Sequence, residues 1–270
     1  PIYFSYCNTS QFLSYVKLGM SFVIDSKSIY PSAFINIVKS EHITVTNVTP
    51  PILDCLLDYG ESSVAALDSL HHLCVGAMGI NKRLWKKAVD KLHNCKIYST
   101  YGMTEMSPRL TTLPSEDFPK KIGSVGLPLQ GVEIIIDKHK DEEYGEILVK
   151  GRNLMLGYYG DSNKPIDKNG YFRTGDLGYL DDDGYLFIKG RLKNVIINNG
   201  MNIYPEEIEN VLEQFPGIHR AYVYGEENSV CGEIPIAKIE VTKNICINDV
   251  AEFCAKTLSP NKIPHRIMIV

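Results

Sequence analysis

The stretch KIYSTYGMTEMSP, residues 96–108, joins a strand-like run to a polar loop. Its first half is rich in β-branched and aromatic side chains, which favours a β-strand. Its second half holds Gly102, Thr104 and Glu105 within four positions. A threonine hydroxyl can donate to a phosphate oxygen and a glutamate can hold Mg²⁺, so the loop is a candidate phosphate and metal site. By composition alone, an ordinary surface turn is the more frequent explanation of such a loop.

Short apolar runs alternate with helical patterns before this stretch. The predicted helices at 30–41 and 50–58 begin with prolines, which are favoured in the first helical turn. Alternating strands and helices are typical of a parallel α/β sheet, and ligands of open α/β folds bind at the carboxyl ends of the strands. The predicted strands are 20–24, 43–48, 70–77 and 96–102, and a third helix is predicted at 81–92.

The pattern of the sequence changes after about residue 120. Short strands separated by Gly, Asp and Asn turns predict a small antiparallel sheet or barrel. The sequence DDDG at 181–184 indicates a hairpin, because Asp and Gly tolerate the positive φ of such turns. After residue 194, an amphipathic helix at 204–217, two strands and a helix at 247–258 predict a small α+β domain.

The predicted fold class is therefore α/β, with a large domain followed by a small α+β domain. The large domain spans 1–190. It comprises a parallel α/β part at 1–119 and a β subdomain at 120–190. The small domain spans 194–270, and the boundary between the two is predicted near residues 190–194.

The bulk composition excludes several classes of protein. A net charge of −4 and the lack of a long basic run argue against nucleic acid as a partner. No apolar run reaches the roughly 18 residues of a membrane helix, and we expect no membrane span. The seven cysteines form no C-x-x-C pair, which favours buried free thiols in a reducing compartment over disulfides or zinc. We therefore expect a cytoplasmic protein.

A second motif, GYFRTGDLGYLDDDGYLFIKGRLKN, occupies residues 170–194. Asp176 follows a Thr-Gly pair that we interpret as a turn between two strands, where its backbone would be held rigidly. A rigid carboxylate suits the two hydroxyls of a ribose, and the guanidinium of Arg191 suits a ribose oxygen or a phosphate. Taken singly, a simple turn carboxylate is the more frequent explanation of Asp176, and a surface cation is that of Arg191.

Together these motifs resemble the adenylate-forming enzymes, which include acyl-CoA synthetases, non-ribosomal peptide adenylation domains and beetle luciferase. The resemblance rests on YSTYGMTEMSP, on residues 170–194 and on NNGMNIYPEEIE, with IGSVGLPLQGVEIII and GEILVKGRNLMLGYY in the expected order. It implies that ATP activates a carboxylic acid to an acyl-adenylate. The acyl group then passes to a thiol of coenzyme A or phosphopantetheine, and fatty acid metabolism is one expected setting.

The resemblance assigns roles in the first motif. Thr104 would contact the phosphates of ATP, and Glu105 would hold Mg²⁺; both are expected to be catalytic. Tyr101 and Gly102 would line the adenine and acyl side. In VGAMG, residues 75–79, the resemblance adds two further lining residues, which are Gly76 and Ala77.

The resemblance also assigns roles around the domain boundary. Asp176 would bind the ribose hydroxyls of ATP or AMP, with Arg191 beside it. Residues 191–194 would be the hinge of a mobile small domain, with Lys193 at the hinge position and grouped with the catalytic residues. Gly200 would border the tunnel for pantetheine.

The resemblance predicts two further elements outside this stretch of sequence. A Ser/Thr/Gly-rich phosphate loop is expected before Pro1, and a catalytic lysine after Val270; Lys262 precedes the place of that lysine. We therefore expect a portion of the large domain, a truncated small domain, and no adenylation by these residues alone. Two alternatives stay open. One is an acyl-AMP ligase or adenylation domain that loads an acyl carrier protein, and the other is a non-catalytic remnant.

Overall fold

The computed structural model describes residues 5–25, 30–59, 65–76, 82–138, 143–160, 165–199 and 201–270. The chain divides into two compact units. The first comprises Pro1–Ile135, Leu148–Arg173 and Leu180–Phe187, and the second comprises Ile136–Ile147, Thr174–Tyr179 and Ile188–Val270. The domain boundary predicted near residues 190–194 and the hinge at 191–194 stay predictions.

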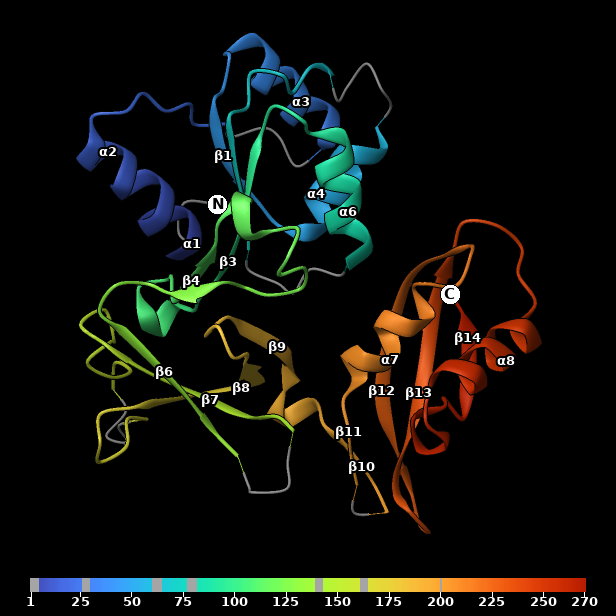
Figure 1. Ribbon diagram of the computed structural model, residues 1–270. Helices are drawn as coiled ribbons and strands as arrows, with labels where there is room; N and C mark the ends of the chain where they lie inside the picture. The colour runs from blue at the N-terminus through green and yellow to red at the C-terminus, as the bar shows by residue number, and fades with distance from the viewer. Residues whose placement is uncertain are drawn as a thin grey trace. The chain divides into compact units, whose positions relative to one another are not determined.

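A five-stranded sheet of order β1-β2-β3-β4-β5 forms the framework of the first unit (Figure 1). The first three strands are parallel, and the last two pairings are antiparallel. This arrangement confirms the α/β class. The strands are β1 (Val45–Val48), β2 (His72–Val75), β3 (Lys96–Tyr101), β4 (Thr111–Leu113) and β5 (Leu127–Pro128).

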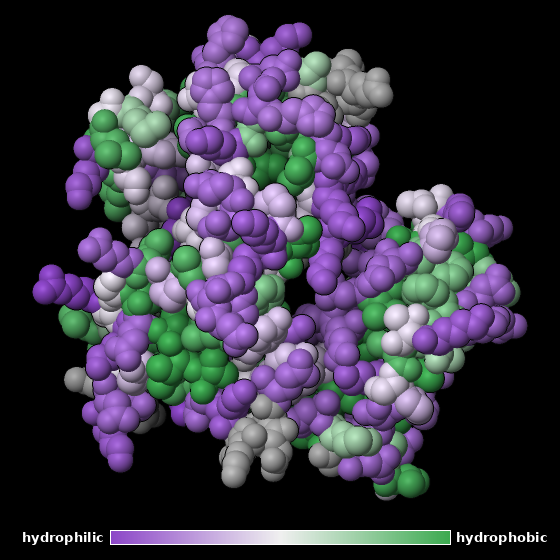
Figure 2. Space-filling model, viewed as in Figure 1, coloured by the Kyte–Doolittle hydropathy of each residue, from purple (hydrophilic) through white to green (hydrophobic). Residues whose placement is uncertain are grey.

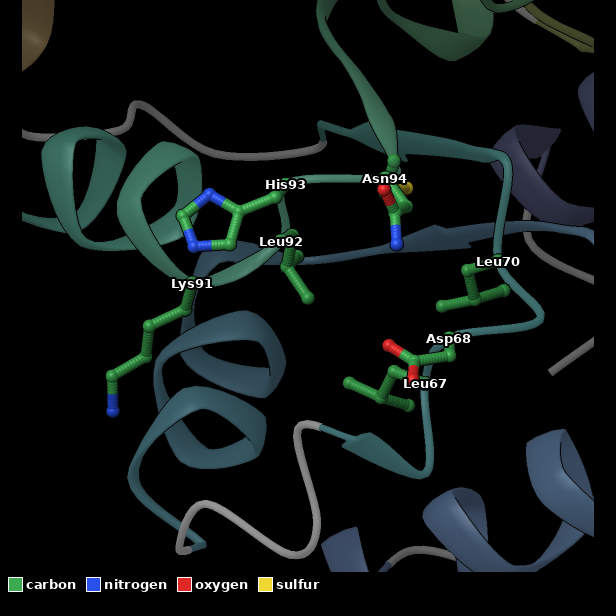
Figure 3. A pocket seen from close by; sticks show the side chains of 8 residues that line it. Leu67, Asp68, Leu70, Lys91, Leu92, His93 and Asn94 are labelled. Atoms are coloured by element: carbon green, nitrogen blue, oxygen red, sulfur yellow. The ribbon is translucent and has the colours of Figure 1, made fainter.

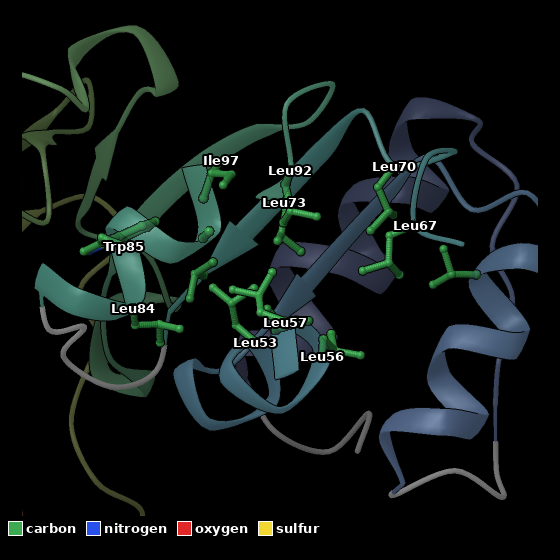
Figure 4. Close-up of a cluster of buried hydrophobic side chains, with 14 of the residues drawn as sticks. Leu53, Leu56, Leu57, Leu67, Leu70, Leu73, Leu84, Trp85, Leu92 and Ile97 are labelled. Carbon is green, nitrogen blue, oxygen red and sulfur yellow. The ribbon is translucent and has the colours of Figure 1, made fainter. Parts of the chain in front are cut away.

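Three helices pack their apolar sides on one face of this sheet. They are α3 (Pro31–Ser40), α4 (Pro50–Asp58) and α6 (Lys82–Lys91). Leu53 and Leu57 of α4 and Trp85 of α6 are buried against Leu73 and Ile97 of the strands (Figure 4). The helices predicted at 30–41, 50–58 and 81–92 are therefore confirmed, and α3 and α4 each carry proline in the first turn.

The basic residues of α6 lie on its outer face. Arg83 and Lys87 pair with Asp54, at 3.3 and 2.8 Å, and Lys87 also pairs with Asp58. Figure 2 shows hydrophilic side chains in purple where α6 lies. Arg83 and Lys87 thus pair with acidic residues of α4.

The N-terminal segment differs from its prediction. It forms α1 (Ser5–Cys7), a π-helical stretch η1 (Asn8–Leu13) and α2 (Ser14–Leu18), which ends at Gly19 with φ 67°. The strand predicted at 20–24 is wrong, because these residues pair with no described strand and are exposed. Ile24, for example, is 70% exposed. The apolar character of a run does not show whether another strand offers an unpaired edge with which it can form hydrogen bonds.

A third region forms a four-stranded sheet of linear order β6-β7-β8-β9, with strands that contribute to both units. Its described strands form an open sheet, so the sheet alternative holds and the barrel does not. Asp181 and Asp183 of the predicted hairpin pair with Lys121, at 2.7 and 2.5 Å, and Gly184 has φ 82°. The strands are β6 (Val132–Asp137), β7 (Gly145–Gly151), β8 (Phe172–Leu180) and β9 (Leu186–Arg191).

The C-terminal part of the second unit is a sheet of order β11-β10-β13-β12, with β14 paired to β13. Helices α7 (Pro205–Leu212) and α8 (Ile247–Thr257) bury Ile208, Leu212 and Val250 against it. The helix predicted at 204–217 is shorter than expected. The strands are β10 (Ile196–Asn198), β11 (Met201–Ile203), β12 (Ile218–Asn228), β13 (Gly232–Val241) and β14 (Arg266–Ile269).

Two further observations concern the whole chain. None of the helices in the described ranges is long and apolar enough to cross a membrane. All seven cysteines are free thiols. Cys254 is buried, but Cys55 and Cys246 are exposed, so the expectation of buried thiols is wrong for these two. The remaining short elements are 3-10 turns at η2 (Thr104–Met106), η3 (Ser115–Asp117), η4 (Leu192–Asn194) and η5 (Pro260–Lys262).

Candidate functional site

The loop after β3 is tightly folded on itself. A Cβ atom at Gly102 would lie 1.7 Å from the carbonyl oxygen of Pro108, so no other residue fits there without moving the backbone. The close approach that Gly102 permits is therefore to Pro108 of its own loop. Ser107 has φ 50° in the left-handed region, which completes the reversal of the chain.

Asn153 fixes this loop from the first turn after β7. Its Nδ2 donates to the carbonyl oxygens of Met106 and Arg109, at 2.7 and 3.3 Å. The hydroxyl of Ser107 donates in return to the Asn153 carbonyl at 2.9 Å. Met106 is fully buried, so its carbonyl depends on this bond. No local pattern predicts this contact of Asn153, because the residue lies 47 positions from Met106.

Thr104 and Glu105 stand on this fixed backbone in η2. Thr104 is exposed, and its hydroxyl lies 2.8 Å from the hydroxyl of Ser5. The Tyr158 hydroxyl donates to Glu105 Oε1 at 2.8 Å, and this bond raises the pKa of Tyr158. No cluster of three or more metal-ligand side chains occurs among the residues that the structure describes. A single carboxylate fits Mg²⁺, which is commonly bound by one or two carboxylates together with substrate phosphates.

Gly76 lies at the carboxyl end of β2, beside the end of β3. A Cβ atom at Gly76 would lie 2.4 Å from the Thr100 hydroxyl and 3.0 Å from that of Tyr6. Tyr101 follows Thr100 as the last residue of β3 and is half-buried. The structure therefore brings Gly76 and the end of β3 together at the carboxyl edge of the sheet. Ala77 lies outside the described residues.

Asp176 lies inside a strand and not in a turn. Strand β8 runs continuously through it, and Gly175 has φ 71° within that strand. Thr174 Oγ1 donates to the Ile147 carbonyl at 2.7 Å and accepts from the Asp176 amide at 3.0 Å. The predicted turn is thus wrong. The backbone at Asp176 is held instead by strand β8 and by the hydrogen bonds of Thr174.

Arg191, at the end of β9, contacts Asp176 directly. Its Nε lies 2.7 Å from Asp176 Oδ1, and Asp176 is only 4% exposed. Half of the Arg191 side chain remains exposed. The sequence placed these two residues beside each other, and the structure does the same.

Glu206 is a residue that the sequence missed. It lies in the first turn of α7, and a Cβ atom at Gly190 would lie 2.3 Å from its Oε2. Within the described chain, this buried Oε2 has no hydrogen-bond partner. Burial raises the pKa of Glu206, and the charge of Asp176 adds to the effect. An acidic first turn is favourable for a helix in any case, so the sequence held no sign of this contact.

The remaining candidates lie after β9. Lys193 is exposed in η4, one turn that leads into β10. Gly200 lies outside the described residues. Lys262, which precedes the expected place of the catalytic lysine, pairs with Glu207 of α7 at 2.8 Å. Thr104 and Glu105 belong to the first unit, and Asp176, Arg191 and Lys193 to the second.

A small pocket lies at the opposite edge of the first sheet (Figure 3). Leu70 and Cys95, which line it, precede β2 and β3, so this is the amino edge. Its volume of about 60 Å³ holds a few water molecules, well below the several hundred Å³ of ordinary ligand sites. The remaining lining residues are Leu67, Asp68, Lys91, Leu92, His93 and Asn94. This pocket is therefore not the candidate nucleotide site.

Comparisons with known proteins agree with the motifs. A 2-succinylbenzoate–CoA ligase of Oceanobacillus iheyensis is 44% identical over 184 residues, which is 67% of this chain and 38% of that protein. The ligase of the same name from Bacillus subtilis is 31% identical over 94% of this chain and 52% of its own length. The chain thus spans about half the length of the curated relatives it matches.

Solved structures show the same likeness. The o-succinylbenzoate CoA synthetase of Bacillus subtilis, in complex with its acyl-adenylate intermediate, matches with a TM-score of 0.87 and 29% identity. That match covers all of this chain and 56% of the synthetase. The same synthetase in complex with ATP and magnesium matches with a TM-score of 0.86.

Family models cover most of the chain. Residues 207–270 match the AMP-binding enzyme C-terminal domain. Residues 1–159, more than half of the chain, match the AMP-binding enzyme family. The motifs, the fold and these matches together place the chain in the family of AMP-binding enzymes.

Proposed function

We propose that the whole gene product activates a carboxylic acid with ATP, releases pyrophosphate, and transfers the acyl group from the acyl-adenylate to coenzyme A. The observation that carries this proposal is the loop at Thr104 and Glu105. Its backbone is anchored by Asn153, while the Thr104 hydroxyl stays exposed. Catalysis of phosphoryl chemistry depends mainly on such positioning and on charge stabilisation.

For the acid, we propose 2-succinylbenzoate or a closely related diacid, because the relatives described above are named for it. For the acceptor, we propose coenzyme A and not a carrier protein, since these relatives are CoA ligases. Their names give no support to fatty acids as substrates.

The residues of the first unit take the following proposed roles. Thr104 donates to a phosphate oxygen of ATP. Glu105, oriented by Tyr158, holds Mg²⁺ together with phosphate oxygens; the ion supplies neutralisation of phosphate charge. The adenine and acyl side is lined by Gly76, Ala77, Tyr101 and Gly102.

The residues of the second unit take complementary proposed roles. Asp176 accepts hydrogen bonds from the ribose hydroxyls, and its ion pair with Arg191 keeps the carboxylate oriented. Lys193 lies at the hinge of the small domain, which needs only a position whose backbone angles can change. Gly200 borders the channel for pantetheine.

The experiment is ATP–pyrophosphate exchange by the whole gene product with a panel of acids, followed by coenzyme A thioester formation. We expect exchange with 2-succinylbenzoate. Glu105→Gln should lower the exchange rate at least tenfold, whereas Glu116→Gln, on an exposed turn of the same unit, should leave it unchanged. Absence of exchange with every acid would refute the proposed function.

A further inference from the structure

The two faces of the first sheet differ in chemistry. Cross-strand neighbours share a face because side chains alternate along a strand. Leu73 and Ile97 are paired and lie in the apolar core. Asn47, Cys74 and Tyr98 form the next row and point to the opposite face. That face is therefore polar where the first is apolar.

The N-terminal helices cover this polar face, on the side of the sheet opposite to α3, α4 and α6 (Figure 1). Asn47 Nδ2 donates to the hydroxyl of Ser10 at 3.4 Å. The hydroxyl of Tyr6 lies 3.4 Å from that of Thr100. Polar groups thus face each other across this layer, which an ordinary structural interface would fill with apolar side chains.

Arg109 brings a positive charge to this layer. It follows the Thr104 loop, and its guanidinium contacts the thiol of Cys74 and lies beside Tyr6 and Tyr15. Its Nε is buried and has no hydrogen-bond partner in the part of the chain that the structure describes. The ion pairs of the described residues include none to Arg109.

The neighbours of Arg109 do not neutralise it. Burial raises the pKa of Cys74, of Tyr6 and of Tyr15, and Arg109 only partly opposes this effect. The thiol and both phenols are therefore uncharged near neutral pH. Arg109 is half-buried as a residue, but its Nε is fully buried, and the desolvation of a positive charge without a counter-charge is costly. A bound anion would supply the missing counter-charge, and the planar guanidinium of arginine matches the geometry of a carboxylate.

The position of Arg109 indicates which part of the acid substrate it would contact. Cys74 lies two residues before Gly76 on β2, which is about 7 Å from the carboxyl edge of the sheet. Thr104 and Glu105 lie beyond that edge, in the loop after β3. An anion held at Arg109 is thus remote from the reacting carboxylate and the phosphates, at the far end of a bound acid.

We propose that Arg109 is a specificity-determining residue that binds a second carboxylate of the acid substrate, so that diacids are selected over monoacids. The inference rests on the proposed function. It assigns the recognition of the second carboxylate to one residue, which membership of the family does not do.

The test compares the whole gene product with Arg109→Gln and Arg109→Lys. The acids are 2-succinylbenzoate and two analogues that each lack one carboxylate, 3-benzoylpropionate and 2-butyrylbenzoate. We expect kcat/KM for the diacid to fall about 100-fold in Arg109→Gln, mainly through KM, because a site built for a polar group discriminates strongly. For an analogue that lacks the remote carboxylate, the change should stay within about threefold. Arg109→Lys should recover part of the loss, and Arg83→Gln, on the exposed face of α6, should change nothing.

A binding measurement separates this inference from the proposed function. Calorimetric titration of 2-succinylbenzoate without ATP should show binding to the unaltered protein and about 100-fold weaker binding to Arg109→Gln. If the unaltered protein activates no acid, the proposed function fails, and the titration alone decides the role of Arg109. Equal losses for diacid and monoacid, no diacid preference in the unaltered protein, or equal binding by both proteins would overturn the inference.

Discussion

Asn153→Ala should release the loop that presents Thr104 and Glu105. The substitution removes two donated hydrogen bonds, at 2.7 and 3.3 Å, and leaves the buried Met106 carbonyl unsatisfied. Each bond contributes about 1 kcal/mol, and an unsatisfied buried carbonyl costs about 1 to 3 kcal/mol. Because the second bond is long and water can enter beside an exposed loop, we expect a loss of about 3 kcal/mol.

Amide hydrogen exchange measures this loss locally. The Leu110 amide donates to the Tyr101 carbonyl at 2.8 Å across the base of the loop. A local loss of about 3 kcal/mol speeds its exchange about 100-fold, and the KM for ATP should rise with it. The control is Asn210→Ala, which removes an exposed bond to the Glu206 carbonyl in α7 and should leave Leu110 unchanged. Exchange at Leu110 that stays within threefold in Asn153→Ala would show that Asn153 does not anchor the loop.

Three further perturbations follow from the structure. Gly102→Ala, whose Cβ would lie 1.7 Å from the Pro108 oxygen, should lower the unfolding temperature and cut adenylation at least tenfold. Gly131→Ala has open space around it, so its loss of stability should come only from the strain of alanine at a φ of 84°. Equal losses of unfolding temperature in the two variants would contradict the argument. Asp176→Asn should raise the KM for ATP about 10- to 100-fold, because hydrogen bonds to a charged group contribute about 1.5 to 3 kcal/mol, and the exposed Asp182→Asn serves as comparison. Burial raises the pKa of Glu209 from 4.5 to about 7, so its contribution to stability is full below pH 4.5 and is lost as the pH rises to 7. Glu209→Gln, which keeps an acceptor for the Val223 amide, should remove that slope and gain up to about 3 kcal/mol at pH 8; unchanged pH dependence of unfolding would argue against a buried carboxyl there.

Local signals explain how much of the fold the sequence could predict. Proline at the start of α3 and α4 and the apolar side of α6 marked three helices correctly. The apolar residues 20–24 favour a strand, yet a strand also needs the edge of a neighbouring strand, and that is a property of the whole sheet. The Thr-Gly pair before Asp176 predicts a turn, but Gly175 adopts its φ of 71° within the continuous strand β8.

The candidate site was predictable only in part for a related reason. Motifs located Thr104, Glu105, Asp176 and Arg191, and the structure pairs the last two. The residues that hold or contact them are distant in sequence. Ser5 is 99 residues from Thr104, and Tyr158 is 53 residues from Glu105. The contact of Gly102 with Pro108 is likewise set by the folding of the loop. Such contacts depend on tertiary packing, which no local sequence pattern predicts.

The alternation of side chains along β1, β2 and β3 gives this protein a simple route to new activities. Replacement of Leu73 or Ile97 would disturb the folding of the chain. Replacement of Asn47, Cys74 or Tyr98 would alter only the layer beneath the N-terminal helices. Evolution, or a directed library restricted to these three positions, can therefore vary the chemistry of that layer while the packing that keeps the sheet folded is preserved on its reverse side.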